Sequence, residues 1–390
     1  MALLLTSAAL ADDVSDAVDS DGARLDVGVS TQYDSNVFFV SGDEVSSPSA
    51  VAQLASGYRW QGELTGVDVA VDGRYQEYTD GSLPTVSAIG AAITVDRAHE
   101  FGSTRVQLAY RDESSLLDVL NNNGDFVGDQ RQHTASASLH RMFELSETSS
   151  IVATLAGSRV KYIDTPAGVQ QDDYDFTSGG SQWEWQYSER VTFGAGVVGS
   201  WYDSNGKRFT NEVTTIGPVL SMRYELGETM SGSVEASYRR SESKTVFLGF
   251  IDQRDSGADY YGRAGVAKQF ERGYLDLDAS RSVQPGSNGS QEIRDEVTAS
   301  FGREVSERIM LHGGVTALKS APTNDGSVGA ANDRRTAFAG DLGVDYVLAE
   351  RVTLTAGYRY LRQNTDAADT DARAQTVVMT LRWELGGTAL

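Results

Sequence analysis

The sequence predicts an all-β chain that forms a transmembrane, antiparallel, up-and-down β-barrel of about eighteen strands, with sixteen as the alternative count. Three observations predict this fold. Apolar and polar residues alternate with a period of two, tight turns alternate with longer polar loops, and aromatic residues gather near both ends of the expected strands. An even number of strands would place both chain ends in the periplasm, as in other single-chain bacterial barrels.

The alternation is clearest in the last expected strand. Val377, Met379, Leu381 and Trp383 fall on one side of it, and Thr376, Thr380, Arg382 and Glu384 fall on the other. A helix would mix these two sets, whereas a strand places them on opposite faces. The same pattern predicts strands at 23–38, 49–61, 66–79, 85–98, 103–115, 131–144, 150–163, 173–187, 190–204, 211–225, 229–242, 257–270, 273–285, 291–304, 308–320, 333–348, 351–363 and 373–385.

The connections between these strands alternate between two kinds. Tight turns that contain Glu stand at 144–148, 188–190, 225–229, 271–272, 306–308 and 349–351. They recur at about 40 residues, the length of two strands, one tight turn and one longer loop. Between them lie stretches rich in Asp, Asn, Gly and Ser at 116–130, 164–172, 243–256, 321–332 and 364–372. Short periplasmic turns that alternate with long extracellular loops are typical of an outer-membrane barrel.

Aromatic residues are expected to form two belts at the membrane interfaces. One set lies beside the tight turns: Trp60, Phe143, Trp183, Trp185, Tyr187, Tyr224, Phe270, Tyr346 and Trp383. The other lies near the opposite strand ends: Tyr33, Tyr75, Tyr110, Trp201, Tyr238, Tyr358 and Tyr360. The two belts lie about nine residues apart along a strand, which is the length a tilted strand needs to cross the hydrocarbon layer. A soluble β-solenoid or β-sandwich would also alternate, but a solenoid has a shorter period and a sandwich rarely confines its aromatics to strand ends.

Composition restricts the possible function classes. The 390 residues include 33 Lys and Arg, 55 Asp and Glu and no Cys, with a formal net charge of -22. The lack of Cys excludes disulfides and thiolate metal sites, and the acidic excess argues against a nucleic-acid-binding surface. No apolar run approaches the roughly 18 residues of a spanning helix, whereas alternating barrel strands average out as hydrophilic.

The chain is expected to contain one membrane domain with short flanking segments. The apolar start ends in Ala9-Leu10-Ala11, the small-x-small pattern that precedes signal-peptidase cleavage. We therefore expect a signal peptide at 1–11 that lacks its basic first part, a periplasmic lead at 12–22, the barrel at 23–385 and an overhang at 386–390. The expected location is the outer membrane of a Gram-negative bacterium.

No catalytic, cofactor-binding or metal-binding residues are predicted, and the chain is not expected to be an enzyme. The four histidines, His99, His133, His140 and His312, show no metal-ligand spacing, and no nucleophile elbow, phosphate loop or H-E-x-x-H motif occurs. The stretch Asn121–Asp125 spaces its oxygens somewhat like a calcium loop, but it lacks the Glu at the twelfth position. It is better interpreted as a surface loop.

Alternation also predicts which polar residues face the lumen. The expected wall contains Arg24, Asp26, Asp34, Asp68, Asp72, Arg74, Arg105, Gln107, Arg111, Glu113, Asp276, Asp278, Arg294, Glu296, Asp341 and Asp345. A barrel of sixteen to eighteen strands encloses an aqueous channel, so these groups can stay hydrated without partners. The simplest interpretation of any one of them is a solvated wall. Together, with their mixed sign and acidic excess, they would favour cations or neutral glycans over small anions.

Two short motifs resemble a known family. The run Tyr33-Asp34-Ser35-Asn36-Val37, echoed by Tyr202-Asp203-Ser204-Asn205, is similar to the element that opens the β-barrel porin-2 family, and the turns at 188–192 and 349–353 resemble its periplasmic turns. The resemblance spans about residues 23–385. It implies an outer-membrane barrel associated with export of capsular or extracellular polysaccharide, and it implies no catalytic residues. Barrels usually end on an aromatic residue, whereas here five further residues follow Trp383-Glu384-Leu385.

The sequence thus predicts a monomeric, passive outer-membrane conduit, with exopolysaccharide or oligosaccharide as the expected solute. The expected partners are outer-membrane lipid and lipopolysaccharide, the polysaccharide or another small hydrophilic solute, and a periplasmic export partner. Two alternatives stay open: a general or nutrient-specific porin, and a structural or adhesive surface barrel with a blocked lumen. A long constricting loop, for which 116–130 and 243–256 are the candidates, would weaken the export hypothesis.

Overall fold

A computed structural model describes residues 22–39, 41–42, 44–81, 83–114, 131–163, 172–206, 209–247, 251–285, 291–322, 334–366 and 370–385. The expected signal peptide, the overhang, Asn121–Asp125 and the loop 116–130 lie outside these residues, as does the expected lead except for Gly22. These expectations stay predictions. In the part of the chain that the structure describes, no helix has the length and hydropathy needed to cross a membrane.

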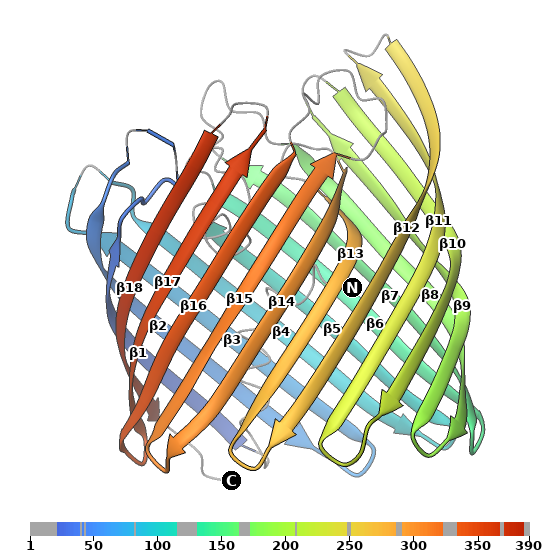
Figure 1. Cartoon of the computed structure of the whole chain (residues 1–390), viewed down its shortest axis with the longest axis horizontal. Helices are drawn as coiled ribbons and strands as arrows, with labels where there is room; N and C mark the ends of the chain where they lie inside the picture. Colours follow the sequence, from blue (N-terminus) through green and yellow to red (C-terminus); the bar gives the residue numbers. More distant parts are fainter. Residues whose placement is uncertain are drawn as a thin grey trace.

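Eighteen strands follow one another along the described chain (Figure 1). They are β1 (Gly22–Asp34), β2 (Ser47–Gln61), β3 (Thr65–Tyr78), β4 (Val86–His99), β5 (Gly102–Ser114), β6 (Arg131–Ser146), β7 (Ser149–Ile163), β8 (Asp173–Ser188), β9 (Val191–Asn205), β10 (Phe209–Glu225), β11 (Met230–Phe247), β12 (Ile251–Phe270), β13 (Gly273–Pro285), β14 (Gln291–Ser306), β15 (Ile309–Pro322), β16 (Arg335–Ala349), β17 (Val352–Thr365) and β18 (Thr370–Leu385).

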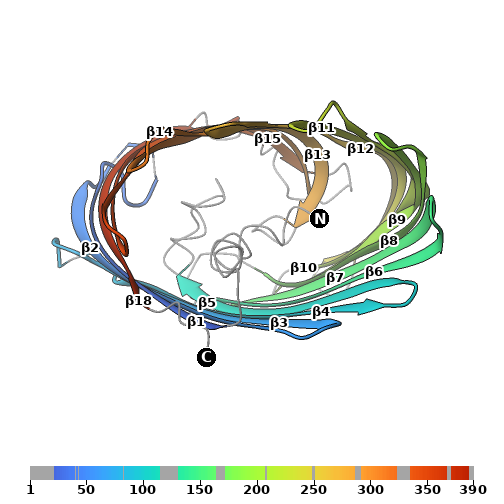
Figure 2. The ribbon, with the colours of Figure 1, turned by 90° about the horizontal axis from the view of Figure 1, so that it is seen from below.

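The strands form one closed antiparallel ring. Each strand pairs with its neighbours in the chain, and β1 pairs with β18 from Leu25 opposite Leu385 to Asp34 opposite Thr376. Seen from below, this ring is an oval (Figure 2). The predicted fold class is confirmed, and the strand count is eighteen, not sixteen.

Two of the tight turns have the sequence Ser-Glu-Arg, at 188–190 and 306–308. In the turn after β8, the Ser188 hydroxyl accepts a hydrogen bond from the Arg190 amide at 3.3 Å, and Ser306 does the same for Arg308 at 3.4 Å. A serine hydroxyl that bonds to a backbone amide two residues on favours a turn. The ladder register shifts by one residue before both turns, as in a β-bulge.

The two faces of the sheet differ in chemistry. The outer face carries exposed apolar side chains such as Val71, Leu155 and Leu277. The alternate residues form the inner face, where side chains reach one another over an intervening strand, as Arg335 of β16 reaches Glu292 of β14. Side chains converge in this way on the concave face of a curved sheet. The exposed apolar face suits hydrocarbon, and the polar face lines the interior.

The aromatic residues predicted to form belts lie on the outer face near the strand ends. Fourteen of them are exposed: Trp60, Phe143, Trp183, Trp185, Tyr187, Phe270, Tyr346, Trp383, Tyr33, Tyr75, Tyr110, Trp201, Tyr238 and Tyr358. Tyr224 and Tyr360 are partly buried. Their contact with the lipid interface stays a prediction.

Three predicted strand ends differ from the structure by four residues or more, at residues 38, 242 and 257. The first strand ends at Asp34 instead of residue 38, because the chain leaves the ladder after Ser35 and the Val37 amide donates to the Val45 carbonyl at 2.8 Å. The expected loop 243–256 is largely a hairpin, since β11 and β12 stay paired out to Phe247 opposite Ile251. It is therefore not a constricting loop in the residues that the structure describes.

Candidate functional site

The candidate site is the inner face of the barrel, and its best-connected part lies on β1, β3 and β18. The Asp34 carboxylate accepts hydrogen bonds from Gln32 Nε2 at 2.9 Å and from Thr376 Oγ1 at 2.8 Å. Arg74 Nη2 donates to Gln32 Oε1 at 3.3 Å and to Gln76 Oε1 at 2.8 Å. Residues two apart in a strand share a face, so the alternation of the sequence builds this network directly.

A second group joins β3 to β5 across β4. Arg111 Nε is 2.6 Å from Glu113 Oε2, and its Nη1 is 3.3 Å from Asp72 Oδ2. Gly90 of β4 lies between the two strands, and a Cβ at this position would overlap the Asp72 carboxylate. The missing side chain of Gly90 therefore permits the contact over β4.

The remaining predicted wall residues occupy the same face, in separate groups. On β1, which closes the ring by pairing with β18, Arg24 Nε lies 2.8 Å from Asp26 Oδ2. Further pairs lie along the same face: Asp68 with Arg59 at 2.5 Å, Arg105 with Asp96 at 2.6 Å, Asp278 with Arg263 at 2.7 Å, Arg294 with Glu296 at 2.8 Å, and Asp345 with Thr355 at 2.6 Å and His312 at 3.2 Å. Gln107, Asp276 and Asp341 also occupy inner-face positions of their strands.

Sequence reasoning missed the partners in these pairs. Arg59, Asp96, Arg263 and His312 share the inner face, but each pair depends on which residues stand opposite one another across two strands. Period-two alternation gives the face of a residue and not its register. The wall is thus a set of short ion pairs and hydrogen bonds, more internally paired than the hydrated wall that was expected.

A segment between β1 and β2 lies inside the barrel near the end opposite the tight turns. We call residues 35–39 the mouth segment. Val37 is 1% exposed and packs on Tyr78, Val86 and Ala88 of β3 and β4, and Phe39 is 5% exposed. Phe39 packs on Leu361, Ala372 and Ala374 of β17 and β18. The two side chains attach the mouth segment to inner-face residues on both sides of β1, so it occupies part of the channel cross-section.

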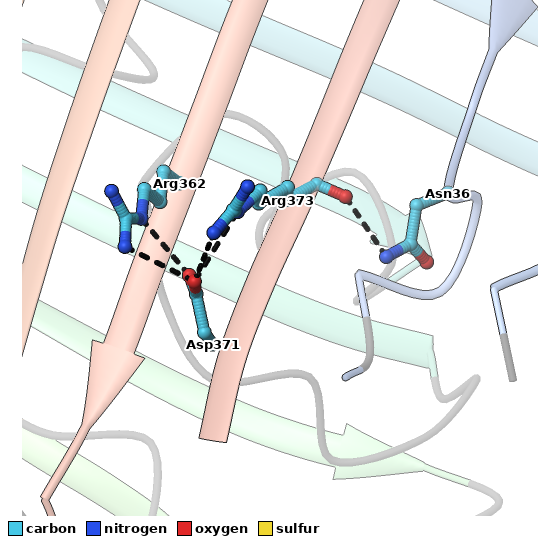
Figure 3. A network of polar contacts seen from close by, with 4 residues as sticks. All are labelled: Asn36, Arg362, Asp371 and Arg373. Carbon is cyan, nitrogen blue, oxygen red and sulfur yellow. Dashed lines mark hydrogen bonds and ion pairs between the residues drawn. The ribbon is translucent and has the colours of Figure 1, made fainter. Parts of the chain in front are cut away.

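Polar contacts hold the mouth segment against β18. Asn36 is fully buried, and its Nδ2 donates to the Arg373 carbonyl oxygen at 3.0 Å (Figure 3). The Gln375 amide donates to Ser35 Oγ at 2.8 Å. Phe39 has a φ of +50°, a conformation that bulky residues rarely adopt, so the surrounding packing must hold it.

On the outer face of the same strand ends, a charged cluster stands beside this attachment. Arg362 Nε and Arg373 Nη2 lie 3.0 Å and 2.6 Å from the Asp371 carboxylate (Figure 3). The backbone of Arg373 thus bonds Asn36, while its side chain pairs with Asp371. The ion pairs thus join β17 to β18 at the strand ends where the mouth segment bonds to the β18 backbone.

The inner face carries hydrogen-bonding and charged side chains that can contact a hydrated solute. Among the described residues, no group of three or more His, Cys, Asp or Glu side chains could hold a metal ion. Two histidines each stand beside one carboxylate: His312 lies 3.2 Å from Asp345 on the inner face, and His133 lies 3.4 Å from Asp112 on the outer face. The available chemistry is that of hydrogen bonds and paired charges.

Three solved structures are similar to this chain in fold. The ferric citrate transporter FecA matches with a TM-score of 0.52 and 9% identity over 95% of this chain and 79% of that chain. The ferric-catecholate import receptor Fiu of E. coli K12 matches with a TM-score of 0.50 and 10% identity over 94% and 82%. The siderophore receptor PiuA of Acinetobacter baumannii matches with a TM-score of 0.50 and 12% identity over 94% and 82%.

The chain is an outer-membrane barrel of the Gram-negative type. This conclusion rests on the closed ring of eighteen strands, its exposed apolar outer face and the likeness to these receptors and transporters. No family model matches the chain, and no curated protein matches its sequence. At identities of 9–12%, the likeness concerns the fold, and membership in the β-barrel porin-2 family stays a hypothesis.

Proposed function

We propose that this barrel is a passive outer-membrane channel for a hydrophilic solute, and that the solute is an oligosaccharide or exopolysaccharide. The observation that carries the proposal is the inner face, where amide, hydroxyl, carboxylate and guanidinium groups follow one another from β18 through β1 to β5. Such groups can exchange their hydrogen bonds with a hydrated solute as it passes. No chemical step is required.

A glycan fits this wall better than a small ion does. The carboxylates Asp34, Asp72 and Glu113 are already paired with guanidinium or amide donors, so the wall presents hydrogen-bonding groups more than net charge. Neutral hydroxyl-rich chains interact with such surfaces without a large desolvation cost. The resemblance of Tyr33–Val37 to the porin-2 opening element points in the same direction.

A nutrient-specific porin is the second candidate, and the mouth segment is the observation that favours it. A fixed segment packed on two sides of the inner face narrows the opening, as a selective channel for small solutes requires. A long polymer would need more free cross-section than a small sugar. In either case the barrel would act as a monomer surrounded by lipid and lipopolysaccharide, and polysaccharide export would add a periplasmic partner.

Single-channel conductance of the refolded full chain in planar bilayers tests the proposal. Stable current steps that acidic or neutral polysaccharide blocks in a concentration-dependent way are expected for a glycan conduit. Steps that respond only to mono- and disaccharides would favour the nutrient-specific porin. A folded barrel, recognised by its heat-modifiable migration in gels, that gives no steps at all would overturn the channel proposal.

A further inference from the structure

Four basic side chains gather on the outer face of β13–β18, in the half of these strands that lies away from the tight turns. They are Arg281 of β13, Lys319 of β15, Arg362 of β17 and Arg373 of β18. The strands follow one another in the ring and lie side by side at the front of the barrel in Figure 1. We call this part of the outer face the cationic face.

The ladder register brings these basic side chains close together. Asp295 of β14 stands opposite both Arg281 and Lys319, and Arg362 stands opposite Arg373. One strand, β16, separates the two groups. Side chains that face each other across neighbouring strands have Cβ atoms about 4.5–5.5 Å apart. The four basic groups therefore form one continuous patch.

Two carboxylates offset part of the charge of the cationic face. Asp371 lies 3.0 Å from Arg362 and 2.6 Å from Arg373 (Figure 3), and Asp295 Oδ1 lies 3.2 Å from Arg281 Nη1. Four positive and two negative side chains leave a formal excess of two positive charges on this half of the described strands. The whole chain, by contrast, carries a formal charge of -22.

Lys319 is the least engaged of the four basic residues. It is exposed, and it makes no hydrogen bond or ion pair with the other residues that the structure describes. Arg281 is more constrained, since its Nη2 also lies 3.6 Å from Asp259 Oδ1 of β12. A lysine ammonium is a mobile point charge that binds phosphate readily. Lys319 is therefore the group most available to an external anion.

Another part of the same rim has the opposite sign. On β8, β9 and β10, Asp175 stands opposite Asp203, and Asp203 stands opposite Glu212, all on the outer face and away from the tight turns. Within the described residues, this half of these three strands has no Lys or Arg on its outer face. The cationic face is therefore a local feature of β13–β18.

Toward the tight turns, the cationic face gives way to an apolar surface. Leu277, Val297, Val315, Phe338 and Leu342 are between 45% and 56% exposed there. A hollow of about 600 Å³, lined mainly by apolar groups, lies between this surface and the cationic face. Six strands at a spacing of ~4.8 Å span about 24 Å, which is wide enough for several acyl chains side by side.

We propose that the cationic face binds the phosphate groups of lipid A, the membrane anchor of lipopolysaccharide, while the acyl chains lie on the apolar surface. Short turns face the periplasm in outer-membrane barrels, so the cationic face belongs to the outer leaflet, where lipopolysaccharide resides. A phosphorylated headgroup above several acyl chains matches an excess of positive charge above a broad apolar surface. This inference is independent of the solute in the lumen.

Titration of the refolded full chain in detergent, followed by native mass spectrometry, tests the proposal with diphosphoryl lipid A as the probe. Lys319→Gln removes the least engaged charge, and Lys319→Arg keeps it. The matched control is Lys161→Gln on the outer face of β7, because Lys161 is also exposed and also has no partner among the described residues. Heat-modifiable migration in gels verifies that each variant is folded.

Lys319→Gln is expected to weaken the binding of diphosphoryl lipid A about fivefold, the effect of one basic residue at an anionic membrane surface. Lys319→Arg and Lys161→Gln are expected to bind like the unmodified chain. Dephosphorylated lipid A should bind more weakly and should not respond to Lys319→Gln. Equal affinities of Lys319→Gln and the unmodified chain for diphosphoryl lipid A would overturn the site. An equal loss of affinity for phosphatidylglycerol would indicate a site for any anionic lipid and overturn the assignment to lipid A.

Discussion

Arg111 of β5 pairs with Asp72 of β3 over the intervening Gly90, at 3.3 Å. This contact, together with the 2.6 Å pair to Glu113, balances one cation against two carboxylates on the inner face. This charge balance predicts that the cation-over-anion selectivity of the channel depends on Arg111 and Asp72. Removal of the cation leaves two acidic groups facing the channel, whereas removal of Asp72 leaves Arg111 with one partner.

Arg111→Gln is expected to raise the cation-over-anion permeability ratio a few-fold, and Asp72→Asn is expected to lower it. Two unit charges about 4 Å apart interact by about 1 kcal/mol in water, which corresponds to less than a tenfold effect. The reversal potential across a salt gradient measures the ratio. The control is Arg159→Gln, which removes the same charge from the Arg159–Asp175 pair on the outer face. An equal shift in the control would refute the inner-face assignment.

The packing of Phe39 predicts that the mouth segment limits conductance. Truncation of a buried phenylalanine costs about 3–5 kcal/mol in protein cores, which is enough to release a short segment already held at an unfavourable φ. Phe39→Ala is therefore expected to increase single-channel conductance. Phe101→Ala is the matched control, because Phe101 is 64% exposed in a tight turn at the other end of the barrel. Unchanged conductance in a folded Phe39→Ala barrel would exclude the mouth segment as the limiting constriction.

The hydrogen bond from Asn36 to the Arg373 carbonyl predicts a contribution to barrel stability. Asn36→Asp preserves the volume but removes the amide donor and buries a charge, and an unsatisfied buried polar group costs about 1–3 kcal/mol. The temperature at which the folded form is lost in heat-modifiability gels should fall. Gln186→Glu makes the same change from amide to acid at an exposed position of β8 opposite Thr192, and it should leave that temperature unchanged. Equal temperatures for both variants would show that the bond contributes little to stability.

Much of this architecture is predictable from the sequence, because the alternation of apolar and polar residues along a strand identifies its outer and inner faces. Trp383 and Glu384 fall on opposite faces for that reason alone. The contact of Arg111 with Asp72 is different: it depends on the register of three strands and on the missing side chain of Gly90. Alternation carries no register, so the inner-face residues were predictable and most of their partners were not.

The mouth segment and the long hairpin of β11 and β12 were missed for related reasons. Val37 and Phe39 continue the alternation of β1, so the pattern predicts a longer strand, whereas the bonds of Ser35 and Asn36 to β18 turn the chain inward. Likewise, residues 243–256 are mostly polar and predict a loop, whereas β11 and β12 stay paired out to Phe247 opposite Ile251. Long-range contacts decide both features, and local propensity does not report them.

The assignment of inner and outer faces can be tested with one pair of adjacent residues. Val71 lies on the outer face between the two belts, and Ala70 lies on the inner face, between Asp68 and Asp72 along β3. An arginine on the lipid face near the bilayer midplane costs about 2–4 kcal/mol, whereas lumen positions tolerate charge. Val71→Arg should therefore lower the free energy of unfolding in lipid vesicles by about that amount. Ala70→Arg gains carboxylate neighbours and should change it little, while shifting the reversal potential toward anions. The opposite order of stabilities would mean that the two faces of β3 have been assigned the wrong way round.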